Sequence, residues 1–167
     1  MILVSSCLAG VECRYNGSHS YVGKINKLVE EKKAVIACPE LLGGFQTPRE
    51  PAEIIGGSGE DVLDGRAVIK TQSGKDVTGL YIKGAYLTLE MARQIKADTI
   101  VLKENSPSCG SGHIYDGSFS SQKIAGNGVT AALLKKEGFR VISEHQIDER
   151  SSSALYFMSA IRCLELH

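Results

Sequence analysis

Short apolar, β-prone runs alternate with helical patterns along this chain, and this alternation limits its fold more than any other feature. Four runs have the composition of strands, at residues 2–6, 34–37, 98–103 and 139–142. Between them, apolar residues recur at helical spacing over residues 22–33, 80–96 and 128–134. The pattern predicts an α/β fold, a single three-layer domain whose central, mostly parallel sheet is flanked by helices. Right-handed crossovers would then place the carboxyl ends of all strands at one edge of the sheet.

The remaining segments are less regular. Residues 42–59 are rich in glycine and proline and cannot be regular throughout, and residues 104–127 have the composition of a long polar loop. A turn at residues 73–75 predicts either a short hairpin or two short extended pieces between residues 68 and 77. We predict one α/β domain over residues 1–146 and a C-terminal extension over 147–167, helical and capped by the serines at 151–153.

Composition excludes several classes of protein. The 167 residues are 43% apolar and 23% charged, which is enough for one well-packed soluble domain. Nineteen basic residues balance nineteen acidic ones, so no global field attracts nucleic acid. No apolar run reaches the roughly 20 residues that span a bilayer, and the N-terminus lacks the pattern of a signal peptide. We therefore predict a cytoplasmic protein with neither a nucleic-acid nor a membrane partner; the sequence leaves a homo-oligomer open.

Three of the five cysteines follow predicted strands. Cys7 and Cys38 come directly after the first and second strands, and Cys109 lies in the loop after the third. Disulfides are rare in the reducing cytosol, and a single cysteine is often only a small buried apolar residue. However, ligands of open α/β sheets bind beyond the carboxyl ends of the strands. The sequence thus predicts that three thiols meet in one crevice that also admits a small-molecule substrate.

Three thiolates suit either zinc or an iron–sulfur cluster. Structural zinc sites normally have four ligands, often with a C-x2-C pair, and this chain has no such pair. A cluster held by three cysteines would leave one iron open to an exogenous ligand, so we favour the cluster. Cys13 competes with Cys7 as the ligand from the first loop, and we interpret it as a packed thiol. Cys163, in an apolar helical pattern, is interpreted as a core residue.

Other chemistry-bearing residues accompany these cysteines. Glu40 follows Cys38 by two positions, where it can either exchange protons with a bound molecule or cap a helix. Residues 103–112 are dense in glycine and serine, and Ser106 and Ser108 lie just before Cys109. Near the same strand ends, a further group can bind substrate or offset the charge of a cluster, although each alone could be a surface residue: Arg14, Tyr15, Arg49 and Lys103.

These residues fall within motifs that resemble a bacterial family long catalogued as a domain of unknown function, which includes the iron–sulfur-dependent thiouracil desulfidases. The resemblance covers about residues 1–145, and its motifs are specific: Ser6–Gly10, Cys13–Gly17, Cys38–Gly44, Thr47–Arg49, Pro51–Glu53, Lys103–Gly110, Ile114–Gly117 and Gly126–Leu134.

The resemblance implies a 4Fe-4S cluster held by Cys7, Cys38 and Cys109, and a non-redox reaction that converts 2-thiouracil to uracil and hydrosulfide. One position departs from the family pattern. The family usually has Arg-Tyr-Asp-Gly, and this chain has asparagine, Asn16, in place of the aspartate, so this position cannot supply an ionisable group.

From these residues we predict a hydrolytic desulfidase. Water activated by Glu40 would attack the thiocarbonyl carbon, and Ser106 or Ser108 would hold or relay a proton. The open iron would supply a soft Lewis acid for the sulfur. Two alternatives remain at this point: a different sulfur-transfer enzyme, and a non-catalytic metal-binding or redox-sensing domain.

Overall fold

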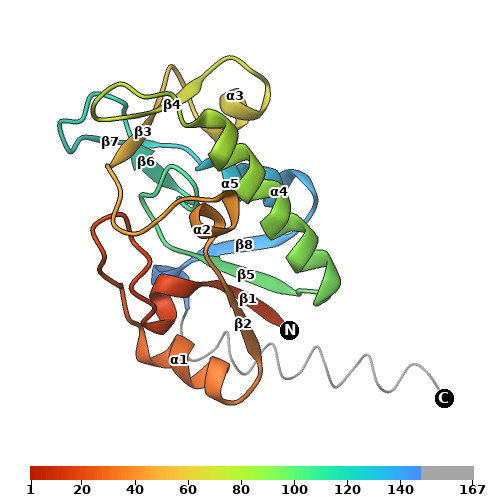
Figure 1. Ribbon diagram of the computed structural model, residues 1–167. Helices are drawn as coiled ribbons and strands as arrows, with labels where there is room; N and C mark the ends of the chain where they lie inside the picture. The colour runs from red at the N-terminus through yellow and green to blue at the C-terminus, as the bar shows by residue number, and fades with distance from the viewer. Residues whose placement is uncertain (148–167) are drawn as a thin grey trace.

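A four-stranded parallel sheet lies at the centre of the computed structural model, which describes residues 1–147 (Figure 1). Its strands, in the order β2-β1-β5-β8, are Ala34–Ala37, Ile2–Ser5, Thr99–Leu102 and Arg140–Ser143. β1 is central, with Val4 opposite Ile36 of β2 and Val101 of β5. The four predicted strands and the predicted parallel sheet are confirmed.

Helices cover both faces of the sheet, as the alternation of elements predicts. Because side chains of a strand point alternately to the two faces, Val4 packs with Ile25 of α1 (Gly23–Glu30), beside the short helix η1 (Ser6–Ala9). Leu3 points to the other face, in the core that contains Leu89 of α4 (Thr78–Gln94) and Leu134 of α5 (Val129–Lys136). β1 is therefore buried on both sides, which explains its continuous apolar sequence.

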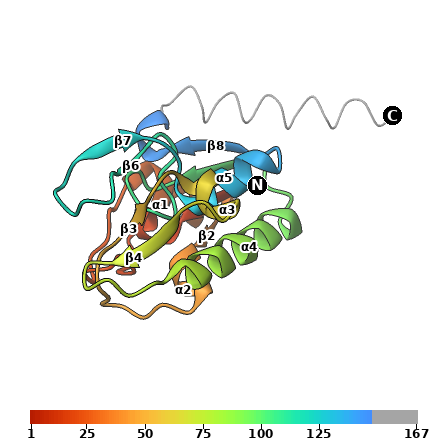
Figure 2. The ribbon, with the colours of Figure 1, turned by 90° about the horizontal axis from the view of Figure 1, so that it is seen from above.

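A short helix positions the second strand exit. α2 (Pro39–Gly43) begins directly after β2 and packs along α4 (Figure 2). The two backbones touch where Gly43 faces Leu80 and where Gly84 faces Pro39, and a Cβ atom on either glycine would overlap the backbone opposite. This close approach fixes the start of α2, where Cys38 and Glu40 lie.

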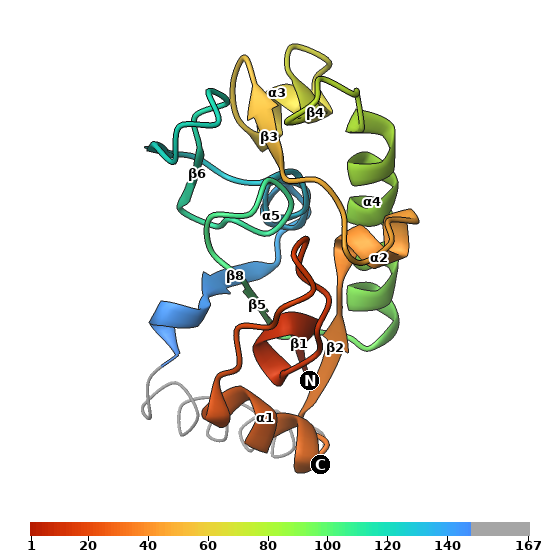
Figure 3. The ribbon, with the colours of Figure 1, turned by 60° about the vertical axis from the view of Figure 1, so that its left-hand side comes forward.

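Two antiparallel pairs lie beyond the carboxyl edge of the sheet. β3 (Ala52–Ile55) pairs with β4 (Val68–Thr71), with α3 (Gly59–Leu63) between them in sequence. β6 (His113–Tyr115) and β7 (Lys123–Ala125) form a hairpin, and β6 lies beside β3 (Figure 3).

These two pairs differ from the sequence expectation in detail. The hairpin expected between residues 68 and 77 is present but short, with a bridge from Lys70 to Asp76 and a backbone hydrogen bond from Val77 to Ile69, and the other edge of β4 pairs with β3. The segment expected to be a loop contains β6 and β7, whose three-residue strands are too short to show alternation.

The described part of the chain ends after β8 with the short helix η2 (Glu144–Gln146). The helix expected over residues 147–167 lies almost wholly outside the described residues, so this helix and the domain boundary at residue 146 stay predictions. Among residues 1–147, no helix combines the length and apolar character needed to cross a membrane.

Candidate functional site

Three strand exits that are far apart in sequence bring their cysteines to one cavity of about 340 Å³. Cys7 lies in η1 after β1, Cys38 is the residue before α2, and Cys109 lies in the loop after β5. Since β2, β1 and β5 are neighbours in the sheet, their exits lie side by side, at the point where the strand order reverses. The cavity therefore occupies the place where open α/β sheets usually bind ligands.

Ser5, the last residue of β1, connects two of these exits. Its hydroxyl donates to the Cys109 sulfur at 3.6 Å and accepts from the backbone N–H of Lys103 at 3.1 Å. Ser5 is 3% exposed, so it holds the Cys109 loop directly over the end of β1. Ser5 was not among the predicted site residues, because in the sequence it is only the polar end of a strand.

Cys13 is a fourth thiol in the same cavity. It is 3% exposed, and its thiol hydrogen-bonds with those of Cys38 and Cys7. A hydrogen bond from Arg49 to the Cys13 carbonyl oxygen, 3.0 Å long, holds the loop that carries it. Cys13 is packed, as expected, but its position also leaves it within reach of any group that Cys7 and Cys38 bind.

Hydrogen bonds between thiols and burial raise the pKa of three cysteines in the cavity, Cys13, Cys38 and Cys109. Burial and the nearby Cys38 raise the pKa of Cys109 to about 12. The hydrogen bond with Cys38 lowers the pKa of Cys13, but the hydrogen bond with Cys7 and burial outweigh it, so that the pKa is about 11. The hydrogen bond with Cys13 and burial also raise the pKa of Cys38. A metal that binds here must therefore displace protons, as is general for thiolate sites.

Glu40 faces the cavity between an arginine and a serine. One of its oxygens accepts from Arg49 Nε at 2.8 Å and lies 2.5 Å from Nη2, while the other accepts from the Ser106 hydroxyl at 3.3 Å. The side chains of Glu40 and Arg49 are 13% and 10% exposed, so water screens the pair only weakly. The carboxylate takes part in this network, and the structure does not use it as a helix cap.

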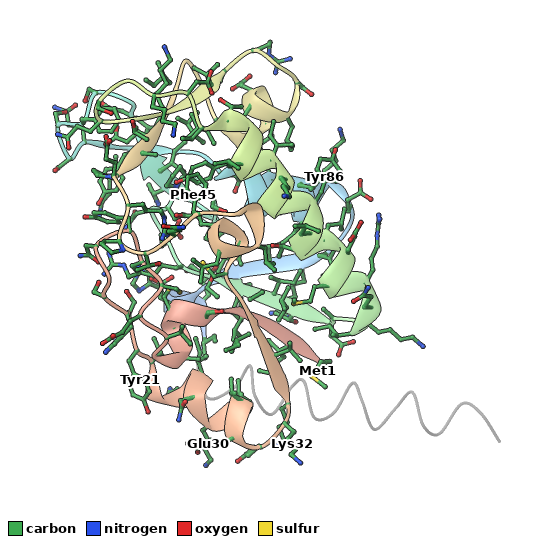
Figure 4. All side chains as sticks on the ribbon, viewed as in Figure 1. Met1, Tyr21, Glu30, Lys32, Phe45 and Tyr86 are labelled. Atoms are coloured by element: carbon green, nitrogen blue, oxygen red, sulfur yellow. The ribbon has the colours of Figure 1, made fainter. Side chains whose placement is uncertain are left out.

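Arg49 is occupied on every nitrogen. Besides Glu40 and the Cys13 carbonyl oxygen, it donates to the carbonyl oxygen of Gln46 and the hydroxyl of Thr47, and its guanidinium lies 5.8 Å from the centre of the Phe45 ring. In the view of Figure 4, Phe45 lies within the outline of the molecule, whereas Tyr21 and Tyr86 lie at its edges. This arrangement suits Arg49 to orienting Glu40; direct contact with substrate stays a prediction.

We expect Arg49→Lys to lower kcat about 10- to 100-fold while the chain still folds. Lysine keeps the positive charge, but its single nitrogen cannot contact Glu40 in the same way as two arginine nitrogens and also donate to the Cys13 carbonyl oxygen. Loss of a charge-assisted hydrogen bond costs about 1.5–3 kcal/mol, which corresponds to this range of rates. Steady-state kinetics with a thermal unfolding control would test it, and unchanged kcat would show that Glu40 is oriented without Arg49.

Ser106 and Ser108 have different surroundings. The Ser106 oxygen accepts from the backbone N–H groups of Ser108 and Cys109, at 3.0 and 3.1 Å, while its hydroxyl faces Glu40. Ser108 is 1% exposed, and its hydroxyl bonds with Thr130 at 2.8 Å and with the Cys109 thiol. Only Ser106 lines the cavity, so Ser108 is placed to support Cys109 from behind.

The first turn of α5 secures the Cys109 loop. Backbone N–H groups of Val129 and Thr130 donate to the carbonyl oxygens of Pro107 and Ser108, at 2.8 and 2.9 Å. Gly128 lies against the backbone of Ser108, and a Cβ atom there would come within 2.5 Å of it. The glycine-rich segment before α5 thus permits the close contact that places Cys109.

Glu104 closes the base of this loop. One of its oxygens accepts from the backbone N–H groups of Ser111, Gly112 and His113 at 2.9–3.0 Å. Burial works against the charged carboxylate, but these hydrogen bonds outweigh it and lower the pKa of Glu104. Glu104 was not among the predicted site residues, since its partners are backbone groups that sequence does not reveal.

Glu104→Gln should lower the free energy of unfolding by about 1 kcal/mol at pH 7, because a neutral amide is a weaker acceptor than a carboxylate. A carboxyl whose pKa is lowered on folding contributes stability above its unfolded pKa and loses that contribution as pH falls. The difference in the free energy of unfolding between the original protein and Glu104→Gln should therefore shrink as pH falls below about 4.5, the ordinary pKa of a glutamate. Urea unfolding of both proteins at pH 7 and pH 4, in the same state of cofactor loading, measures this; an equal gap at both pH values would contradict it.

Tyr81 is a further residue that sequence reasoning missed. It lies on the inner face of α4, is 3% exposed, and packs on Phe45 with 4.8 Å between ring centres. Burial, and next the charge of Glu40, raise its pKa well above the ordinary value. In the sequence, its helical spacing indicates only one more core residue. In the structure, its hydroxyl hydrogen-bonds with Glu40 at the cavity wall.

The other predicted residues lie around the cavity. Arg14 and Tyr15 line it, and Tyr15 is 42% exposed. Lys103 also lines it, but its ammonium is paired with Glu144 at 2.7 Å. Asn16 faces its own turn, where its side-chain oxygen accepts from the backbone and hydroxyl of Ser18 at 3.1 and 2.6 Å.

Comparison with known proteins agrees with this geometry. A model of the 2-thiouracil desulfurase family matches residues 2–146. The chain belongs to this family. The resemblance drawn from the sequence motifs is therefore confirmed, and so is the expectation of an enzyme of the thiouracil desulfidase type.

Two similar proteins, one curated sequence and one solved structure, match nearly the whole chain. The chain is 69% identical over 149 residues to the uncharacterized protein YbbK of Bacillus subtilis (strain 168), which covers 89% of this chain and 99% of YbbK. It also matches the solved structure of the 4Fe-4S-dependent thiouracil desulfidase TudS, with 39% identity and a TM-score of 0.80, over 93% of this chain and 97% of that one. The predicted α/β fold class is thus also that of TudS.

Proposed function

We propose that this protein is an iron–sulfur-dependent desulfidase that hydrolyses thiolated pyrimidines such as 2-thiouracil to uracil and hydrosulfide. One observation carries the proposal: thiols from three adjacent strand exits share a cavity with a carboxylate that is hydrogen-bonded to a serine. The dependence of TudS on a 4Fe-4S cluster supports it.

The donor set fits such a cluster. Thiolates are soft ligands and are the usual ligands of iron–sulfur clusters. The exits of β2 and β5 are two strand spacings apart, about 10 Å, which suits a multi-atom cluster better than one metal ion. Within residues 1–147, no three His, Cys, Asp or Glu side chains are grouped for a single ion. We assign Cys7, Cys38 and Cys109 as the ligands; bound there, the cluster would supply a soft Lewis acid for the sulfur of the substrate.

The protein's own residues would manage the water and its proton. Glu40 would accept the proton of the attacking water, while Arg49 holds the carboxylate in place. Ser106, between Glu40 and the backbone of Cys109, would hold the water or relay its proton. The thiocarbonyl carbon exchanges its bond to sulfur for a bond to oxygen and keeps its oxidation state. Sulfur leaves as hydrosulfide, so the reaction requires no electron donor.

The direct test is turnover without a reductant. After anaerobic reconstitution, the protein should convert 2-thiouracil to uracil and release one sulfide for each uracil formed. A strict requirement for an electron donor, or no uracil at all, would contradict the proposal. A parallel panel of other thionucleobases and thioamides would reveal a different sulfur substrate at the same site.

Asn16→Asp should leave kcat and KM within about twofold of the original protein. The side-chain oxygen of Asn16 accepts two hydrogen bonds within its own turn and does not line the cavity. Aspartate can accept the same bonds. Surface substitutions away from the core and from buried polar networks usually change the stability of a protein little. A change of more than about tenfold in kcat would show that this position acts in the reaction.

A further inference from the structure

Two of the motifs, Pro51–Glu53 and Ile114–Gly117, have no role in the proposed reaction, and they contact each other. Glu53, at the end of the first motif, is 7% exposed and lines the cavity. One of its oxygens accepts from the backbone N–H groups of Gly117 and Phe119, at 2.9 and 3.1 Å. A buried carboxylate of β3 thereby holds the tip of the β6–β7 hairpin, residues 116–122, of which Phe119 and Ser121 line the cavity.

The hairpin tip is held in an unusual conformation. Phe119 and Ser121 have φ values of 56° and 63°, in the left-handed region that bulky residues rarely adopt. Such a conformation persists where the surroundings over-determine it, and it is commoner at ligand sites. Besides Glu53, Asp116 secures the tip: its backbone N–H donates to Gln122 at 3.0 Å, and its carboxylate accepts from Ser118.

The constraint presents an aromatic ring to the cavity. Phe119 lines the cavity and is half-buried, and within residues 1–147 it stacks on no other ring. The neighbouring Tyr115 already has the Lys123 ammonium over its ring, 5.9 Å from the centre. Among the described residues, neither a ring nor a cation is stacked on Phe119, in contrast to Tyr115, so we take its ring as the one that can contact a planar ligand.

We infer that Phe119 is a specificity-determining residue that stacks on the planar ring of the substrate, and that Glu53 is the positioning residue that holds it there. The inference rests on the proposed desulfidase function. It adds that the site should prefer substrates whose thiocarbonyl belongs to a flat heteroaromatic ring. Stacking on an aromatic side chain suits any nucleobase, because every base presents a π-face. The ring would act through binding alone, so it should affect KM and leave kcat unchanged.

Variants at Phe119 separate a stacking ring from apolar bulk. Phe119→Ala and Phe119→Leu should each raise KM for 2-thiouracil about tenfold or more, the usual effect of removing a stacking ring. Phe119→Tyr should restore the original KM, and kcat, iron and sulfide content should stay unchanged in all three. Phe119→Leu is the matched control. If its KM equalled that of the original protein, apolar bulk alone would suffice for binding and the inference would be overturned.

Variants at Glu53 test the positioning role. Glu53→Ala should raise KM as Phe119→Ala does, whereas Glu53→Gln, whose carbonyl oxygen can still accept both N–H groups, should keep a KM near the original. The double variant Glu53→Ala/Phe119→Ala should be no worse than Phe119→Ala, because both remove the same interaction. Additive effects on KM, or a loss of kcat in Glu53→Gln, would overturn the role.

Direct binding distinguishes this inference from the proposed function. Calorimetric titration of the cluster-loaded protein with uracil should show weaker binding in Phe119→Leu by the same factor as KM. Turnover by the original protein with an unchanged KM in Phe119→Leu would overturn the aromatic contact alone. A cluster-loaded original protein that binds uracil through Phe119 but never releases sulfide would overturn the proposed reaction alone. If the original protein neither binds nor turns over, both are wrong.

Discussion

Cys109→Ser should lose the cluster and, with it, more than about 100-fold of the desulfidase activity. Cys109 is 6% exposed and lies at the point where the β5 exit meets Ser5 of β1, so nothing else from its loop can replace its sulfur. A serine hydroxyl is a hard, weakly acidic ligand that suits iron–sulfur clusters poorly. Removal of a group merely adjacent to a metal ligand already costs about 10- to 100-fold, so loss of the ligand itself should cost more. Visible absorption and iron content after anaerobic reconstitution, together with the rate of uracil release, measure both effects.

Cys7 and Cys13 offer a matched pair within the same cavity. Both are buried and belong to the first loop, and each can reach Cys38, directly or through the other thiol. We expect Cys7→Ser to behave like Cys109→Ser and Cys13→Ser to retain the cluster, because Cys7 leaves β1 directly. The reverse result would transfer the ligand assignment to Cys13, and a full cluster in Cys109→Ser would rule out the site altogether.

Glu40→Gln should lower kcat by about 10²- to 10⁴-fold, the usual contribution of a general base, while the cluster remains. Glutamine can keep a hydrogen bond with Ser106 but cannot accept the proton of the attacking water. The expected signature is a protein with normal colour and iron content that binds 2-thiouracil and scarcely releases sulfide. Single-turnover assays would show whether the chemical step itself is slowed.

Glu90→Gln is the control for this substitution. Glu90 lies on the exposed side of α4, away from the cavity, so the same chemical change there should leave kcat unchanged. If Glu40→Gln also kept its kcat, the water would have to be activated elsewhere, and Tyr81, whose hydroxyl hydrogen-bonds with Glu40, would be the next residue to examine.

The sheet and the convergence of the three cysteines could be predicted because both follow from local pattern and topology. β1, β2, β5 and β8 are short apolar runs that separate clearly from the helices, and parallel strands must share one carboxyl edge. Cys7 and Cys38 follow their strands closely, so the topology alone brings them to one edge. Cys109 lies further along the loop after β5, and its contacts with Ser5 and α5 complete its placement.

The parts that could not be predicted depend on contacts between segments with no local signal. β3 and β4 pair across the intervening α3, whereas the turn at residues 73–75 indicates only the local bridge on the other edge of β4. The bonds of Glu104 and Glu53 are made to backbone N–H groups, which every residue type except proline carries. Arg49 could be placed near the site, but its orientation towards Glu40 depends on the fold of the loop between them.

The iron and acid-labile sulfide content of anaerobically isolated protein tests the nature of the cofactor most directly. We expect a brown protein with about four iron and four sulfide per chain, as a 4Fe-4S cluster requires. A colourless protein that carries one zinc per chain, with neither iron nor sulfide, would contradict the proposed chemistry.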